Sequence, residues 1–404
     1  MNEPTVRDLE DLKERRVLVR ADFNVPLHDG AVADDSRIVA ALPTIHFLLE
    51  REARVILMSH LGRPGGTVVE ELRLAPVANR LRELMGVTVR NVSDCVGPIA
   101  LKAAEELNHG EILLLENLRF HTGEEANDAE FAGALASLAD VYVNEAFPAS
   151  HRSHASIVGV PRDLPSAIGL LMERETRTIY DVLVKPARPL VLVMGGAKPE
   201  DKVPLVAKLL PLIDEGLLGG LVGATFLAAI GTKVGKTPVA SPKLALARDV
   251  YLGSGKSKLR LPVDVAVGPR ATPDVKYRVS PVDRIKDDEE IFDIGPRTMT
   301  RFADTIMRAG TVVWNGPPGL FEVNELSRGT VAVAQAVART AARTLVGGGD
   351  TVRALNILGL ADDVSFVSTG GAAFLQFLLD DDLPGLQAVR AHAYAGGAER
   401  AAVP

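Results

Sequence analysis

The sequence lacks the features that disulfide-linked, nucleic-acid-binding and membrane proteins require. It contains a single cysteine, Cys95, so no intramolecular disulfide can form and a reducing compartment is expected. Lys and Arg number 45 against 52 Asp and Glu, a net charge of −7, and the absence of a basic block argues against nucleic-acid binding. The charged first residues show no apolar signal region, and glycines interrupt the longest uncharged stretch, 216–232. We therefore expect a cytoplasmic protein without a membrane or nucleic-acid partner.

The remaining composition is that of an ordinary globular protein, with 47% hydrophobic and 24% charged residues. At 404 residues the chain is longer than one hydrophobic core usually serves, so two domains are expected. A helical stretch near residue 171 runs into the proline-containing KPARP segment, which breaks it. We place the first domain at 1–170, a linker helix with the hinge at 171–189, the second domain at 190–390 and a tail at 391–404.

Short aliphatic runs alternate with amphipathic segments along both halves. Runs without polar alternation are typical of strands buried on both faces, and strand–helix alternation indicates parallel sheets. A helix is expected where Ile38, Leu42, Ile45 and Leu49 recur at three- and four-residue spacing, with Asp35 or Ser36 as N-cap. We predict an α/β protein with two doubly wound, Rossmann-like domains and a cleft between them. The expected strands include RVLVR (16–20), RVILM (54–58), EILLLENL (111–118), DVYVN (140–144), PLVLVM (189–194), TVVWN (311–315) and RTLVG (343–347).

The residues that follow the strands of the first half are basic. In open α/β sheets ligands bind beyond the carboxyl ends of the strands, so these positions should meet at one rim. Guanidinium groups bind phosphate and carboxylate with two hydrogen bonds, and such a rim is suited to a small, multiply charged anion. The basic residues at these strand ends are Arg20, His60, Arg63, Arg119, His121, His151, Arg152 and His154.

Glycines follow the strands of the second half, for example Gly195-Gly196, Gly347-Gly348-Gly349 and Gly370-Gly371. Glycine permits close backbone approach, and a following helix N-terminus offers free N–H groups to phosphate. Several such loops in one domain indicate a nucleotide polyphosphate. Two segments, GTKVGKT (231–237) and YLGSGKSK (251–258), end like a phosphate-binding P-loop. Neither is complete, because Ile230 and Val250 occupy the position of the first glycine.

Long motifs of the chain resemble the phosphoglycerate kinase family from about residue 16 to about residue 390. The matching segments are RADFNVPL, DSRI, SHLGRP, LLLENLRFHTGEE, AFPASHRSH, GGAKPEDK, LPVD, DIGP, VVWNGPPGLFE, GGGDT and VSTGG. The resemblance implies reversible phosphoryl transfer from 1,3-bisphosphoglycerate to ADP, giving 3-phosphoglycerate and ATP in glycolysis and gluconeogenesis. It also implies Mg²⁺ with the nucleotide and small-molecule partners. We expect a monomer, which no motif of the sequence specifies.

The resemblance also implies roles for individual residues. Arg37 would stabilise the phosphoryl group in flight together with Lys198, Gly370 and Gly371. The substrate-binding residues would be Asp22, Phe23, Asn24, Arg37, His60, Leu61, Gly62, Arg63, Arg119 and Arg152. The nucleotide-binding residues would be Lys198, Lys202, Asn315, Glu322, Gly348, Gly349, Asp350 and Thr351, with Asp350 holding Mg²⁺ through the nucleotide.

Two alternatives stay open at this point: a non-catalytic paralogue that keeps only the fold, and a kinase for another acyl phosphate. Leu221 and Ala372 depart from the usual glycines of the family, so nucleotide preference is open as well. The histidine spacing shows no carboxylate partner pattern, and we predict no transition-metal site. His121 and His154 are interpreted as hydrogen-bonded structural groups and Cys95 as a small apolar filler.

Overall fold

A computed structural model describes residues 3–270 and 276–393. The chain divides into two compact units, one made of residues up to 177 together with those from 380 onward, and one of residues 178–379. Helix α6 (Leu170–Val184) is continuous and contributes residues to both units. Within the described ranges, no helix combines the length and the apolar character that a membrane crossing requires.

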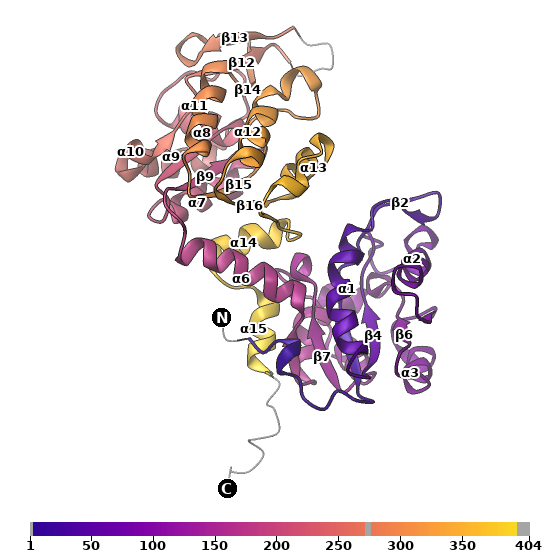
Figure 1. The fold of residues 1–404 in the computed structure, drawn as a ribbon. Coiled ribbons are helices and arrows are strands. Elements are labelled where there is room, and N and C mark those ends of the chain that lie inside the picture. Colours follow the sequence, from indigo (N-terminus) through magenta and orange to yellow (C-terminus); the bar gives the residue numbers. More distant parts are fainter. Residues whose placement is uncertain (1–2, 271–275, 394–404) are drawn as a thin grey trace. The chain divides into compact units, whose positions relative to one another are not determined.

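The first unit is built on a six-stranded sheet in the order β5-β6-β4-β1-β7-β8, with every neighbouring pair parallel. Consecutive parallel strands need crossovers, and helices supply most of them (Figure 1). The strands are β1 (Arg16–Arg20), β4 (Arg54–Met58), β5 (Val89–Asn91), β6 (Ile112–Leu114), β7 (Val141–Asn144) and β8 (Ser166–Ile168), with a hairpin of β2 (Leu27–His28) and β3 (Ala31–Val32). The helices are α1 (Ser36–Leu49), α2 (Ala75–Met85), α3 (Gly97–Glu105), α4 (Thr122–Ala126) and α5 (Ala129–Ala136).

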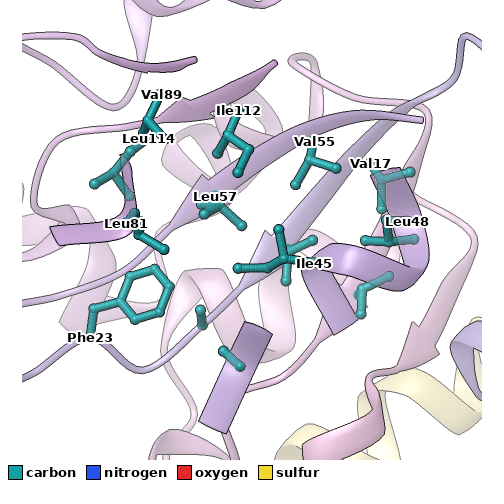
Figure 2. Close-up of a cluster of buried hydrophobic side chains, with 14 of the residues drawn as sticks. Val17, Phe23, Ile45, Leu48, Val55, Leu57, Leu81, Val89, Ile112 and Leu114 are labelled. Carbon is teal, nitrogen blue, oxygen red and sulfur yellow. The ribbon is translucent and has the colours of Figure 1, made fainter. Parts of the chain in front are cut away.

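The core of this unit lies between the sheet and the helices α1 and α2. Ile45 and Leu48 of α1 are fully buried against Val17, Val55 and Leu57 of the strands, as Figure 2 shows. The predicted helix spacing is therefore correct for α1. Its expected N-cap bond does not form, because the carboxylate of Asp35 is bound instead by Arg80 at 2.7 Å.

The second unit repeats the architecture with a parallel sheet in the order β11-β10-β9-β15-β16-β17. Its strands are β9 (Leu190–Met194), β10 (Glu215–Leu218), β11 (Leu259–Arg260), β15 (Thr311–Asn315), β16 (Arg343–Gly347) and β17 (Phe366–Val367). The helices include α7 (Pro199–Leu209), α8 (Gly220–Ala229), α9 (Leu244–Val250), α10 (Lys256–Lys258), α11 (Pro296–Met307), α12 (Arg328–Arg339), α13 (Gly349–Leu358) and α14 (Ala372–Asp380). The unit also contains a small antiparallel sheet of β12 (Asp264–Gly268), β13 (Arg278–Pro281) and β14 (Glu290–Ile294). Its strand order is β13-β12-β14.

The segment after residue 380 packs with the first unit, although the sequence placed residues up to 390 in the second domain. Helix α15 (Pro384–Ala391) buries Leu386 and Val389. The amide of Gly385 donates to the carbonyl of Ser150 at 2.9 Å, and Arg390 forms an ion pair with Glu3. The physical cause is that α15 packs against β8 and the 155–162 segment, which are distant in sequence and which local patterns do not specify.

A buried carboxyl group anchors the start of α6. Glu145 follows β7 and is 1% exposed, and its oxygens accept hydrogen bonds from the hydroxyl of Thr44 and from the amide of Leu171 at 3.1 Å. Burial raises the pKa of Glu145 to about 8, against the opposing effect of these donors. The proton is therefore bound more tightly in the folded protein than in the unfolded chain.

This difference predicts a stability that depends on pH through Glu145. A carboxyl whose pKa rises on folding contributes fully at low pH, and the contribution is lost as pH rises toward 8. Between pH 5 and pH 8 the free energy of unfolding should fall by on the order of 3 kcal/mol from this group. Glu145→Gln should remove that part of the pH dependence in urea denaturation, whereas Glu130→Gln, on the exposed surface of α5, should not. Identical pH profiles for wild type and Glu145→Gln would contradict the assignment.

Candidate active site

The first unit gathers basic side chains at the carboxyl ends of its strands, beginning with Arg20 at the end of β1. Arg20 is 1% exposed; its Nε donates to Ser156 Oγ at 2.8 Å, and its Nη2 lies 3.1 Å from His60 Nδ1. Burial, with the charges of Arg20 and Arg119, lowers the pKa of His60 to about 3. His60 is therefore a neutral hydrogen-bonding group near pH 7, and the guanidinium groups carry the positive charge.

The turn after β1 is bound to the turn after β4. Asn24 Oδ1 accepts from the amide of Gly62 at 2.9 Å, and Ser59 Oγ accepts from the amide of Phe23 at 2.8 Å. The side chain of Phe23 is buried in the core, as is that of Leu61. These two predicted residues thus support the site through their backbones and their packing.

Asp22 orients Arg37 at the first turn of α1. Its Oδ2 accepts from Arg37 Nη1 at 2.8 Å, and its Oδ1 accepts from the amide of Asn24. Burial opposes the charged form of Asp22, but the charges of Arg37 and Arg20 and the Asn24 amide favour it, and the pKa of Asp22 is lowered. Asp22 is therefore ionised at neutral pH and holds Arg37 at the rim.

Arg119 lies in the short 3₁₀ helix Leu118–Phe120 that follows β6, and it is 5% exposed. Its Nη1 donates to the carbonyl of Gly62 at 2.7 Å. Its Nε lies 3.2 Å from Glu125 Oε1 but has no hydrogen bond of acceptable geometry. Burial lowers the pKa of this guanidinium, which nevertheless stays charged. The Nε of Arg119 is thus held by an ion pair with Glu125 rather than by a well-aligned hydrogen bond.

Two further predicted arginines keep their charge available. Arg63 is exposed and Arg152 is half-buried, and among the described residues neither forms an ion pair. Arg20 was expected at this rim from its position at the end of a strand, whereas Ser59, Ser156 and Glu124 were not assigned to the site. These three contribute through contacts between distant segments. Ser156 Oγ, for example, donates to Glu124 Oε1 at 2.6 Å.

In the second unit, four glycine-containing loops pack against one another at the carboxyl ends of the central strands. The amide of Gly196 donates to the carbonyl of Pro317 at 2.8 Å, and the amide of Gly220 donates to that of Pro318 at 2.9 Å. A Cβ on Gly220 would lie 2.8 Å from the nitrogen of Gly196, so glycine is required for this approach. The helices α7, α8 and α13 start directly after these loops, and their N-termini favour phosphate.

Lys202 is buried beneath these loops. Its Nζ donates to the carbonyl of Gly195 at 2.6 Å. Burial lowers the pKa of Lys202 to about 8, although Asp350 and Asp201 oppose the shift. Near pH 7 it is largely a cation, which an incoming anion would stabilise further.

The loop after β16 depends on Gly348, whose φ is +97°. Asn315 Nδ2 donates to the carbonyl of Gly347 at 2.8 Å, and Thr351 Oγ1 accepts from the amide of Gly316 at 2.7 Å. Both side chains are 1% exposed, so they brace the loops from below. The structure places the other predicted nucleotide-binding side chains, those of Lys198, Glu322 and Asp350, on the surface of this unit.

Comparisons with known proteins identify the family of the chain. A family model described as "Phosphoglycerate kinase" matches residues 6–381. A phosphoglycerate kinase of Thermomicrobium roseum is 52% identical over 384 residues, covering 95% of this chain and 98% of that one. One from Moorella thermoacetica is 50% identical, with the same coverage. The chain belongs to the phosphoglycerate kinase family.

Solved structures extend the match to the fold. Phosphoglycerate kinase from Coxiella burnetii superimposes with a TM-score of 0.86 at 38% identity, covering 97% of this chain and all of that one. The structure of phosphoglycerate kinase from Pyrococcus horikoshii gives 0.83 at 31% identity, covering 96% and 99%. The expected family, the α/β class with parallel-sheet domains, and the kinase activity of the transferase class are thereby confirmed.

A further buried residue of this phosphoglycerate kinase-family chain supports the segment that carries Glu322. Asp293 is 2% exposed and accepts from the amides of Gly329 at 2.7 Å and Ile294 at 2.8 Å. Burial raises its pKa to about 7. Because Gly319 and Gly329 both lie directly against its carboxyl group, Asp293 fixes the two ends of the segment that carries Glu322. The sequence motif DIGP contained this residue, but nothing local indicated its partners.

Gly348→Ala should destabilise the protein more than Gly359→Ala. Both positions have positive φ, but a Cβ at 348 would lie 2.5 Å from Asn315 Nδ2, whereas a Cβ at 359 meets no atom within 4 Å. We expect a loss of about 1 kcal/mol for Gly359→Ala and about 2–3 kcal/mol for Gly348→Ala in urea denaturation. Equal losses would show that the contact with Asn315 contributes nothing to stability.

Proposed function

We propose that the basic rim of the first unit binds the glycerate substrate and that the glycine-rich loops of the second unit bind the nucleotide. The buried guanidinium of Arg119, whose Nε contacts Glu125 at 3.2 Å without a well-aligned hydrogen bond, is the observation that supports the first assignment most directly. Guanidinium groups match the planar oxygens of phosphate and carboxylate, and 3-phosphoglycerate carries both. Arg63 and Arg152 add charge without an ion pair among the described residues, and Asn24 and Asp22 suit the hydroxyl and carboxylate region of the substrate.

For the nucleotide, the N-terminus of α13 and the cationic Lys202 form the phosphate-binding part of the proposal. Lys198 precedes α7 and is exposed, so its side chain can reach the transferring phosphoryl group. Glu322 would accept hydrogen bonds from the ribose. Thr351, whose Oγ1 already accepts from Gly316, retains its hydroxyl proton for a phosphate oxygen.

Mg²⁺ fits the donor set around Asp350. Magnesium prefers carboxylate, water and phosphate oxygens, and Asp350 is an exposed carboxylate in the first turn of α13. The ion would enter with ATP or ADP and neutralise charge on the phosphates. Asp350 also interacts electrostatically with Lys202, so the two side chains would balance charge around the same phosphates.

The chemical step needs positioning more than it needs a reactive side chain. An oxygen of the ADP β-phosphate attacks the phosphorus of the acyl phosphate on C1 of 1,3-bisphosphoglycerate. The bond from that phosphorus to the acyl oxygen breaks, which leaves the C1 carboxylate of 3-phosphoglycerate. Arg37, Lys198 and the amides at Gly370 and Gly371 would stabilise the migrating group. In-line transfer requires the two ligands to meet in a water-poor space, and we assign the hinge for this closure to the linker segment 171–189. Cytoplasmic location and a monomeric state complete the proposal.

The two alternatives, a non-catalytic paralogue and a kinase for another acyl phosphate, are disfavoured by the same residues. A non-catalytic chain has no reason to keep Arg37, Lys198, Lys202, Glu322 and Asp350 together, and a different acceptor would not need the arginine set. Arg37 and Arg119 are moreover held by specific partners.

A coupled assay with ATP, Mg²⁺ and 3-phosphoglycerate should show formation of 1,3-bisphosphoglycerate. The full set of charged groups assigned to the reaction is present, so turnover in the usual range of enzymes, about 1–10³ s⁻¹, is expected. Acetate and glycerate, offered in parallel, should give no comparable rate because they lack the phosphate that the arginines bind. Turnover with acetate and none with 3-phosphoglycerate would replace the proposal by the second alternative, and no turnover at all would support the first.

Arg37→Ala should lower kcat by about 10²- to 10³-fold, the usual effect of removing one donor that stabilises transition-state charge. The affinity for ADP should change little, because Arg37 belongs to the first unit. The matched control is Arg51→Ala: Arg51 follows the opposite end of α1, where its Nη1 donates to the carbonyl of Phe47 at 3.2 Å. Steady-state kinetics and calorimetric ADP titration check both. An unaltered kcat for Arg37→Ala would remove Arg37 from the transition state.

A further inference from the structure

Three potential metal ligands meet at the edge of the first sheet. Asp94 and Cys95 lie between β5 and α3, whereas His121 follows the 3₁₀ helix after β6. Strands β5 and β6 are parallel neighbours, with Asn91 paired to Leu114, so the segments after them leave the sheet on the same side. The sequence showed no carboxylate partner for His121, because the partner is 27 residues away and only sheet pairing brings it close.

The geometry of the three side chains is well defined. One donor atom of each, the Sγ of Cys95, an imidazole nitrogen of His121 and a carboxylate oxygen of Asp94, lie within 4.8 Å of one another. Asp94 Oδ1 is 2.7 Å from His121 Nε2 and accepts from the amide of Cys95 at 2.7 Å. The imidazole stacks on the ring of Phe131 at 5.2 Å between centroids, which fixes its orientation.

We propose that Asp94, Cys95 and His121 form a binding site for a divalent transition-metal ion of the zinc type. Thiolate, imidazole and carboxylate are zinc ligands, and three of them leave a fourth tetrahedral position for water. Metal–ligand bonds of roughly 2.0–2.3 Å place the donor atoms of such a site about 3.3–3.6 Å apart. The observed cluster reaches this arrangement with small side-chain movements.

The electrostatic surroundings of the cluster favour a cation. The carboxyl groups of Glu124 and Glu116 add negative charge near Cys95 beside that of Asp94. Arg73 pairs with Glu116 at 3.1 Å, and His154 lies 3.6 Å from Glu124, but Asp94 itself faces His121. Zinc is bound by the thiolate form of cysteine, so binding would release the thiol proton to solvent.

An ion can reach the site from solvent. The side chains of Asp94 and His121 are 41% and 35% exposed, while Cys95 is buried. Bound metal would replace the Asp94–His121 hydrogen bond with two coordinate bonds and would connect the 94–95 segment to the 121 turn. This site differs from that of Mg²⁺ in the reaction, because magnesium binds thiolate and imidazole poorly. It also does not depend on the proposed function.

Titration of the untagged full-length protein with Co²⁺ tests the proposal. The wild type should develop a sulfur-to-cobalt charge-transfer band and tetrahedral d–d bands, and Zn²⁺ should abolish them by displacement. Cys95→Ser should lose the charge-transfer band, and His121→Asn should bind at least about tenfold more weakly than wild type. The matched control is His109→Asn: His109 pairs with Glu14 at 3.0 Å and belongs to no such cluster among the described residues, so its spectrum should equal that of wild type.

A second measurement avoids dependence on the variants. X-ray absorption at the zinc edge of the wild-type protein, loaded with one equivalent of Zn²⁺, should show one sulfur scatterer together with nitrogen and oxygen. Absence of a sulfur scatterer, absence of a charge-transfer band at saturating Co²⁺, or identical titrations of wild type and Cys95→Ser would overturn the proposal. The last result would assign any binding to surface carboxylates.

Discussion

The anion site of the first unit depends on the contacts that hold the buried, positively charged side chain of Arg20. Its guanidinium is fixed by Ser156 and by the carbonyl of Ala21, and its Nη2 lies next to His60. From this position it helps to keep His60 neutral and to keep Asp22 and Glu124 ionised. A charge of this kind is costly to bury, so the surrounding acceptors are required. The same contacts of Arg20 determine where Ser156 and His60 lie.

The second unit is suited to a different ligand, a polyphosphate, and offers backbone amides rather than guanidinium groups. A polyphosphate needs many N–H donors in a small space, and these can converge only if loop backbones approach closely. Gly220 and Gly348 permit that approach, and Asn315 and Thr351 hold the loops from beneath. Lys202 then supplies charge from a buried position. In each unit, buried polar groups shape the site while exposed charged groups, such as Arg63 and Lys198, are available to the ligand.

Several of the supporting groups are ionisable and buried, which connects folding to proton binding. Glu145 at the start of α6 and Asp293 beneath the Glu322 loop both bind a proton more tightly in the fold than in the unfolded chain. Each accepts backbone amides that an apolar side chain would leave without a partner. These carboxyl groups therefore fix the backbone near the site by binding its amides. When they ionise, the free energy of unfolding falls.

The sequence by itself determined the alternation of strands and helices, the parallel α/β class and the family, because each rests on local patterns or on motifs that are contiguous in the chain. Asp22, Arg37, Lys202 and Thr351 could be named for the same reason. Tertiary structure decided what contiguous patterns do not encode: the partnership of Arg20 with Ser156, the bracing of the Glu322 loop by Asp293, and the packing of α15 on the first unit. It also brought Asp94 and Cys95 to His121. These contacts join segments whose proximity depends on strand order, and strand order is fixed by how the whole sheet packs with its helices.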